Sequence, residues 1–115
     1  MYGRRRLGKS ELVKEFVSRS RGRAISFLVS DSSKQDNLLH FEGDLRVQLG
    51  IVKGLASWDD LFAALEAAIG DKLIVVFDEV QRLLDIDRGF FSRLQHWWDD
   101  RLRKQPICLV MIGSA

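Results

Sequence analysis

The sequence feature that most constrains the fold of this chain is residues 3–10, which read GRRRLGKS. They match G-x-x-x-x-G-K-[ST], the pattern of a phosphate-binding P-loop between a buried strand and a helix. Gly3 and Gly8 permit the backbone angles that turn successive N–H groups toward an anion. The pattern therefore predicts a phosphate-binding site at the start of the first helix. The alternative is a basic turn between two glycines that only caps that helix.

The polar residues that close this loop have a defined chemistry. The Lys9 ammonium can lie between the terminal phosphates of a nucleotide, and the Ser10 hydroxyl can ligate Mg²⁺. The helix that begins here adds its positive end to the same site. Basic residues also gather in this part of the chain: Arg4, Arg5, Arg6, Lys9, Lys14, Arg19, Arg21 and Arg23. This cluster fits a polyanion, with a triphosphate as the simplest ligand and nucleic acid as the alternative.

Composition narrows the class of protein and the setting. With 115 residues the chain forms one domain at most, and 46% hydrophobic with 30% charged residues is typical of a globular protein. Cys108 is the single cysteine, which excludes a disulfide framework, and His40 and His96 are isolated in sequence. The N-terminus lacks the apolar segment of a signal peptide, and no apolar run reaches membrane-spanning length. We therefore expect a cytoplasmic protein without a membrane partner.

Helix-period and strand-like segments alternate along the chain. Helices are predicted over residues 9–20, 34–49, 58–69 and 90–103, and strands over residues 24–30, 73–77 and 107–112. Such alternation indicates β-α units and a parallel sheet. Residues 73–77 read LIVVF, an unalternating hydrophobic run that is typical of a central strand covered on both faces. Ser57 and either Ser32 or Ser33 are the candidate N-caps of two of these helices.

Two carboxylates, Asp78 and Glu79, follow the most hydrophobic strand directly. Ligands of parallel α/β sheets bind beyond the carboxyl ends of the strands, so both residues are expected at the same edge as the P-loop. There Asp78 can hold the Mg²⁺ shell, and Glu79 can orient or polarise an attacking water as a general base. The alternative is an acidic surface turn in which Glu79 pairs with Arg82.

Other polar and aromatic residues admit a functional and a structural interpretation. Ser114 follows the next strand, where its hydroxyl can contact the water or the γ-phosphate as a sensor, or can simply be part of a turn. The triplet at residues 4–6 can contact phosphate, and the sequence favours solvent or an acidic partner instead. Trp58 and Trp98 are expected to pack within the protein or at a domain interface, not to stack on bases.

Four segments together resemble the prokaryotic (archaeal-type) AAA/STAND ATPase family. They are residues 2–12, 75–79, 94–99 and 112–114, which occur in the order and spacing of that family and cover essentially the whole chain. The form Y-G-R-R-R-x-G-K-[ST] is fairly specific to it. The resemblance implies an α/β fold, a three-layer P-loop NTPase core of the ASCE/AAA type with a mostly parallel sheet in the strand order 5-1-4-3-2.

The same resemblance assigns roles to individual positions, with ATP and Mg²⁺ as the ligands. It implies Glu79, Lys9 and Ser114 as catalytic residues and Ser10 and Asp78 as metal ligands. The nucleotide-binding positions are Gly3, Arg4, Arg5, Arg6, Leu7, Gly8, Lys9, Ser10 and Glu11.

As a domain, residues 1–115 are expected to form a partial P-loop ATPase, with Walker A at 3–10, Walker B at 73–79 and the sensor strand at 107–114. Strand 1 of the family is reduced to Met1 and Tyr2, and strand 5 and the helical lid are missing. We therefore expect a truncated piece of a longer protein. Loss of strand 1 would leave an exposed edge on the sensor strand. Family members usually continue into a lid, a winged-helix region and often a nuclease-like domain.

The function expected from these features is ATP binding and Mg²⁺-dependent ATP hydrolysis in the core of a molecular switch. The alternatives are a non-hydrolysing nucleotide-binding module and a nucleic-acid-binding interaction module. The resemblance leaves open a nucleic-acid or protein partner, bound through further C-terminal domains, and a homo-oligomer. A kinase shares the P-loop, but the adjacent Asp78 and Glu79 favour water as the nucleophile.

Overall fold

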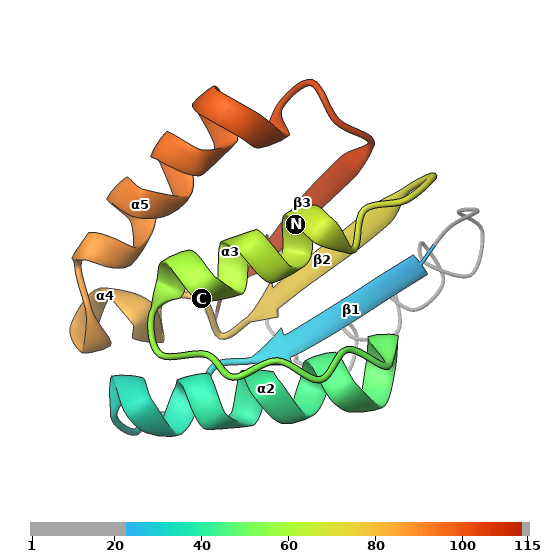
Figure 1. The fold of residues 1–115 in the computed structure, drawn as a ribbon. Helices are drawn as coiled ribbons and strands as arrows, with labels where there is room; N and C mark the ends of the chain where they lie inside the picture. The colour runs from blue at the N-terminus through green and yellow to red at the C-terminus, as the bar shows by residue number, and fades with distance from the viewer. Residues whose placement is uncertain (1–22, 114–115) are drawn as a thin grey trace.

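A computed structural model describes residues 23–113 of the chain, and these form a parallel sheet with helices packed against it (Figure 1). The strands of this part are β1 (Arg23–Leu28), β2 (Leu73–Asp78) and β3 (Ile107–Ile112), in the order β1-β2-β3. The register pairs Leu28 with Asp78 and Asp78 with Ile112, so the carboxyl ends of the strands are level. The predicted α/β fold with a parallel sheet is confirmed.

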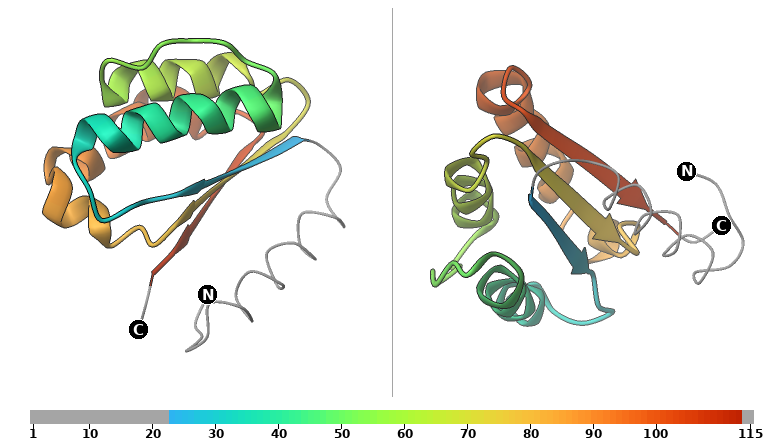
Figure 2. Two further views of the ribbon diagram at one scale, coloured as in Figure 1. Left: turned by 90° about the horizontal axis from the view of Figure 1, so that it is seen from below. Right: turned by 90° about the vertical axis from the view of Figure 1, so that its right-hand side faces the viewer.

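Helical crossovers connect the strands. Between β1 and β2 lie α2 (Lys34–Leu49) and α3 (Trp58–Ala67). Between β2 and β3 lie α4 (Arg82–Ile86), α5 (Gly89–Trp97) and the π-helical turn η1 (Trp98–Leu102). Helices α2, α3 and α5 all cover one face of the sheet (Figure 2). Across residues 23–113, no helix is both long and apolar enough to cross a membrane.

The helix ends follow the local chemistry of their sequence. The Ser33 hydroxyl accepts a hydrogen bond from the Asp36 backbone N–H at 3.1 Å, and the Ser57 hydroxyl accepts one from the Asp60 N–H at 3.4 Å. Helix α2 ends at Gly50, whose φ of 69° lies in the left-handed region that glycine adopts without a steric penalty. The predicted caps Ser33 and Ser57 are thus confirmed.

The main core is a cluster of aromatic rings between the sheet and its helices. Phe27 of β1 lies 5.2 Å from Phe77 of β2 and 4.8 Å from Phe41 of α2, measured between ring centroids. Trp58 packs edge-on against Phe90 at 4.9 Å and is 1% exposed, so its predicted packing role is confirmed. These contacts fix helices α2, α3 and α5 against the strands that carry the carboxylates.

Strand β2 is buried on both faces, as its unalternating sequence predicts. Val75 and Phe77 belong to the aromatic core, while Ile74 and Val76 form a second buried cluster with Ile112 on the opposite face. All five apolar residues of the strand are at most 2% exposed. A central strand of this kind holds its final residue, Asp78, in a fixed place.

The last helix and strand depart from prediction in two respects. The helix predicted over 90–103 passes from α-helix to π-helix at Trp98, and both Trp97 and Trp98 are only half-buried because adjacent side chains cannot both face the core. Strand β3, whose six residues are nearly all apolar and would suit a buried strand, is half-buried over most of its length, and its Met111 is 38% exposed. The cause is its position at the end of the sheet formed by residues 23–113.

Candidate functional site at the carboxyl edge of the sheet

The turns that leave the three strands are tied to one another by backbone hydrogen bonds. The Val29 N–H, just after β1, donates to the Asp78 carbonyl oxygen at 3.0 Å. The Val80 N–H, just after β2, donates to the Ile112 carbonyl oxygen at 3.0 Å. The parallel ladder is therefore extended past its last residues, which aligns the turns at the edge where α/β proteins bind ligands.

Asp78 and Glu79 lie at this edge, at the end of the central strand, where the sequence predicts them. Asp78 is the last residue of β2 and is half-buried. Glu79 has a φ of 60°, and among residues 23–113 no other non-glycine residue has a positive φ. A non-glycine residue in the left-handed region costs about 1 kcal/mol or more, and such strain concentrates at functional positions. The chain thus turns sharply at the second carboxylate.

The Glu79 carboxylate is buried and held by side chains that follow it. The residue is 3% exposed. Gln81 donates its side-chain N–H to Glu79 Oε2 at 2.7 Å, and Arg82 Nε forms an ion pair with the same oxygen at 3.8 Å. Arg82 also donates to the Val29 carbonyl oxygen at 2.9 Å, which anchors its guanidinium to the end of β1. The Glu79–Arg82 pairing of the alternative interpretation therefore exists, but Glu79 is not part of an acidic surface turn.

Gln81 also reaches the end of the neighbouring strand. A Cβ atom built on Gly113, the residue that follows β3, would lie 3.1 Å from Gln81 Oε1. The amide of Gln81 consequently lies between the Glu79 carboxylate and the backbone of Gly113. The sequence does not predict this role, for which the available signal is a glutamine two positions after the second carboxylate.

A buried asparagine, also missed from the sequence, fixes the loop that leaves β1. Asn37 of α2 is 0% exposed, and its side-chain N–H₂ donates to the Ser30 carbonyl at 3.2 Å and the Ser33 carbonyl at 2.9 Å. Its Oδ1 accepts from the Ser30 backbone N–H at 2.9 Å. These bonds satisfy a buried amide and hold the β1 exit loop beside Arg82 and Val29.

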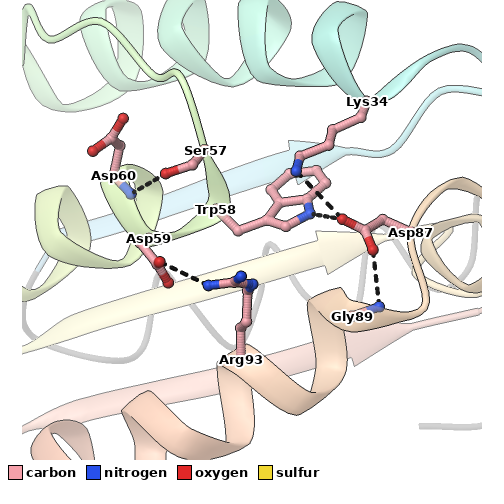
Figure 3. A network of polar contacts seen from close by, with 8 residues as sticks. All are labelled: Lys34, Ser57, Trp58, Asp59, Asp60, Asp87, Gly89 and Arg93. Atoms are coloured by element: carbon pink, nitrogen blue, oxygen red, sulfur yellow. Dashed lines mark hydrogen bonds and ion pairs between the residues drawn. The ribbon is translucent and has the colours of Figure 1, made fainter.

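A second polar network lies behind this edge and is centred on Asp87 (Figure 3). One of its oxygens accepts from Trp58 Nε1 at 2.9 Å and pairs with Lys34 Nζ at 3.4 Å, and the other accepts from the Gly89 N–H at 2.9 Å. The bond from Trp58, with those from Gly89 and Lys34, lowers the pKa of Asp87 below its ordinary value. Asp87 thereby joins the starts of α2, α3 and α5 into one frame.

The remaining predicted site residues lie outside the described part of the chain. They are the loop positions Gly3, Arg4, Arg5, Arg6, Leu7, Gly8, Lys9, Ser10 and Glu11, together with Ser114. Of the predicted set, the structure therefore brings together Asp78 and Glu79, and it places Gly113 next to them. Within residues 23–113, no group of three or more His, Cys, Asp or Glu side chains could hold a metal by itself.

Comparison with known proteins assigns the chain to a family. A model described as an AAA domain matches residues 1–115, which is the entire chain. The chain belongs to the AAA domain family. This family is a class of P-loop NTPases, so membership implies nucleotide binding or hydrolysis.

A curated relative of the chain is an archaeal protein. The chain is 37% identical over 57 residues to the uncharacterized protein MJ0424 of Methanocaldococcus jannaschii. The match covers 49% of this chain and 55% of that protein, so the chain spans about half the length of the relative.

Proposed function

We propose that this AAA domain binds Mg-ATP and hydrolyses it, as the core of an AAA/STAND-type molecular switch. The observation that carries the proposal is the buried, hydrogen-bonded Glu79 directly after Asp78, at the carboxyl end of the central strand. In this proposal residues 3–10 are the Walker A loop, residues 73–79 are Walker B and residues 107–114 are the sensor strand.

The topology of the sheet supports this assignment. The order β1-β2-β3, all parallel, agrees with strands 2, 3 and 4 of a 5-1-4-3-2 core of the ASCE type. In that order, β2 would be the Walker B strand and β3 the sensor strand. Strand 1 would then lie along the outer edge of β3.

In this proposal, separate groups of residues would bind the phosphates, hold Mg²⁺ and contact the γ-phosphate or the water. The loop from Gly3 to Glu11 would surround the phosphates with backbone N–H groups, and Lys9 would neutralise their charge. Ser10 and Asp78 would hold Mg²⁺, and a half-buried carboxylate at a strand end suits a cation that prefers oxygen ligands. The metal, when bound, would neutralise charge on the transferring phosphoryl group. Ser114 would contact the γ-phosphate or the attacking water.

Glu79 would act on the attacking water. A general base must be held within hydrogen-bond reach of the proton that it accepts. The left-handed turn at residue 79 and the bond from Gln81 restrict where the carboxylate can point. Burial also keeps bulk water from replacing the one water that has to be oriented.

Steady-state ATP hydrolysis tests the proposal. Glu79→Gln keeps the shape of the side chain but removes the base, so kcat should fall by roughly 100-fold or more while nucleotide binding persists. Glu66→Gln is the matched control, because Glu66 lies on α3 and pairs with Arg101 at 3.1 Å, away from the proposed site. An unchanged kcat in Glu79→Gln, or no hydrolysis by the parent chain, would contradict the proposal.

The contacts of Trp97, at the end of helix α5, do not favour the nucleic-acid alternative. Trp97 donates to Asp59 at 3.3 Å, and the guanidinium of Arg101 lies over its ring at 5.1 Å from the centroid. The Trp97 ring is thus engaged by the chain's own side chains, which makes it less available for stacking on a base. Strong loss of binding to a single-stranded oligonucleotide with rising salt would favour the alternative instead.

A further inference from the structure

We propose that Gln81 is a positioning residue that orients the Glu79 carboxylate and links it mechanically to the end of β3. The inference deepens the proposed function and rests on Glu79 being the group that acts on water. It assigns a role to a residue outside the predicted motif.

The first step is the contact between Gln81 and Glu79. The donor–acceptor distance of 2.7 Å is at the short end for an N–H donor to an oxygen, as expected when the acceptor is charged. The bond is made to one defined oxygen, Oε2, so it restrains rotation of the carboxylate about its last torsion. Because Glu79 is buried, few water molecules are available to replace that bond.

The second step concerns the carbonyl oxygen of the same amide, Gln81 Oε1. A glutamine amide carries an N–H₂ group and a carbonyl oxygen, and in Gln81 it is the N–H₂ group that donates to Glu79. That oxygen lies where a side chain on Gly113 would begin, 3.1 Å from an ideal Cβ position. A side chain on residue 113 would therefore require the end of the Gln81 side chain to shift by a few tenths of an ångström, which would disturb its bond to Glu79.

The third step is the position of Gly113 in the chain. It directly follows β3 and directly precedes Ser114, the proposed sensor. The Val80 N–H bonds to the Ile112 carbonyl at 3.0 Å, so the turn that carries Gln81 is attached to the same strand end. A displacement of the end of β3 would consequently reach Glu79 through the Gln81 amide as well as through this backbone bond.

An NMR measurement that needs no nucleotide tests the contact itself. The side-chain ¹H–¹⁵N signal of Gln81, identified by its loss in Gln81→Met, should be displaced from that of Gln95, which is exposed on α5. Gly113→Ala should move the Gln81 signal and leave the Gln95 signal in place. Coincidence of the Gln81 and Gln95 signals, or no response to Gly113→Ala, would overturn the inference.

Steady-state kinetics tests whether the contact between Gln81 and Glu79 affects ATP hydrolysis. Gln81→Met preserves the length of the side chain but removes both polar atoms, so kcat should fall roughly 10- to 100-fold with KM unchanged, as for a misplaced catalytic group. Gly113→Ala should lower kcat in the same sense. The double variant should match Gln81→Met, because the bond to Glu79 that Gly113→Ala disturbs is already absent there. Gln95→Met is the matched control and should behave as the parent.

The outcomes separate this inference from the proposed function. A parental kcat in Gln81→Met, or effects of Gln81→Met and Gly113→Ala that multiply in the double variant, would contradict a shared role through one amide. Absence of hydrolysis in the parent would overturn the proposed function, and the NMR result alone would then decide whether Gln81 holds Glu79. Gln81→Asn serves as a second variant if Gln81→Met does not melt cooperatively.

Discussion

At the scale of single residues, the edge of the sheet and the helix starts near it are organised by polar side chains that hold neighbouring side chains and backbone groups. Glu79 is held by Gln81 and Arg82, and Asn37 holds the loop after β1. Asp87 does the same for Trp58 and the start of α5. In each case a buried polar group meets a partner of complementary chemistry, which avoids the cost of an unsatisfied donor or acceptor.

Removal of Asp87 should destabilise the domain. In Asp87→Ala the indole N–H of Trp58, a residue 1% exposed, loses its acceptor, and we expect a loss of about 1–3 kcal/mol in the free energy of unfolding. Urea denaturation measures the change. Asp85→Ala, an exposed position on α4, is the control and should change stability by less than about 0.5 kcal/mol. Equal effects of the two substitutions would contradict the role given to Asp87.

The same carboxylate should give the domain a defined pH dependence. The pKa of Asp87 in the folded protein is below 3.8, so the charged form stabilises the fold fully above that pH. This stabilisation should be lost as the pH falls through the lower folded value. Asp87→Asn cannot titrate, so the parent should lose more stability than Asp87→Asn between neutral and strongly acidic pH. Parallel stability curves for the two proteins would contradict the assignment.

At the scale of elements, helix α2 illustrates how far local chemistry determines a segment. Its start at Ser33 and its end at Gly50 follow from side-chain capping and from the left-handed preference of glycine. Its buried face carries Leu38, Phe41 and Leu45. Gly43 is the exception, because it lies in the helix interior without a packing reason: a Cβ atom there would meet nothing within 4 Å.

The two glycines of α2 should respond to alanine in opposite directions. Gly43→Ala should stabilise the domain by about 1 kcal/mol, since alanine has the higher helix propensity and the site has room. Gly50→Ala should destabilise it by roughly 1–2 kcal/mol, since its φ of 69° is unfavourable for a residue with a Cβ atom. Chemical denaturation of both variants provides the measurement. A loss of stability in Gly43→Ala would show that the helix interior requires glycine.

At the scale of the whole molecule, the sequence predicts what depends on local pattern. The strands around Val75 and Leu109 and the caps Ser33 and Ser57 are confirmed. Hydrophobic runs and capping residues act within a few positions of one another, so they can be recognised in the sequence. Asp78 and Glu79 also lie at the carboxyl end of the central strand, as its hydrophobic run predicts.

Long-range contacts account for what the sequence did not reveal. The roles of Asn37, Gln81 and Asp87 depend on partners that the fold brings together, such as Trp58, 29 positions before Asp87. The spacing of apolar residues in the sequence does not indicate which distant side chains will pair. The partial exposure of β3 likewise depends on its place at the end of the sheet formed by residues 23–113, and not on its own hydrophobic run.

Nucleotide binding by this AAA domain is the claim on which the account depends, and thermal unfolding with Mg-ATP tests it most directly. A ligand that binds only the folded state should add about 2.7 kcal/mol at a hundred times its dissociation constant, which raises the melting temperature. The parent and Lys53→Ala, which removes an exposed lysine elsewhere, should be stabilised equally, whereas Lys9→Ala should not be stabilised. No stabilisation of a cooperatively melting parent, or equal stabilisation of Lys9→Ala, would contradict the account.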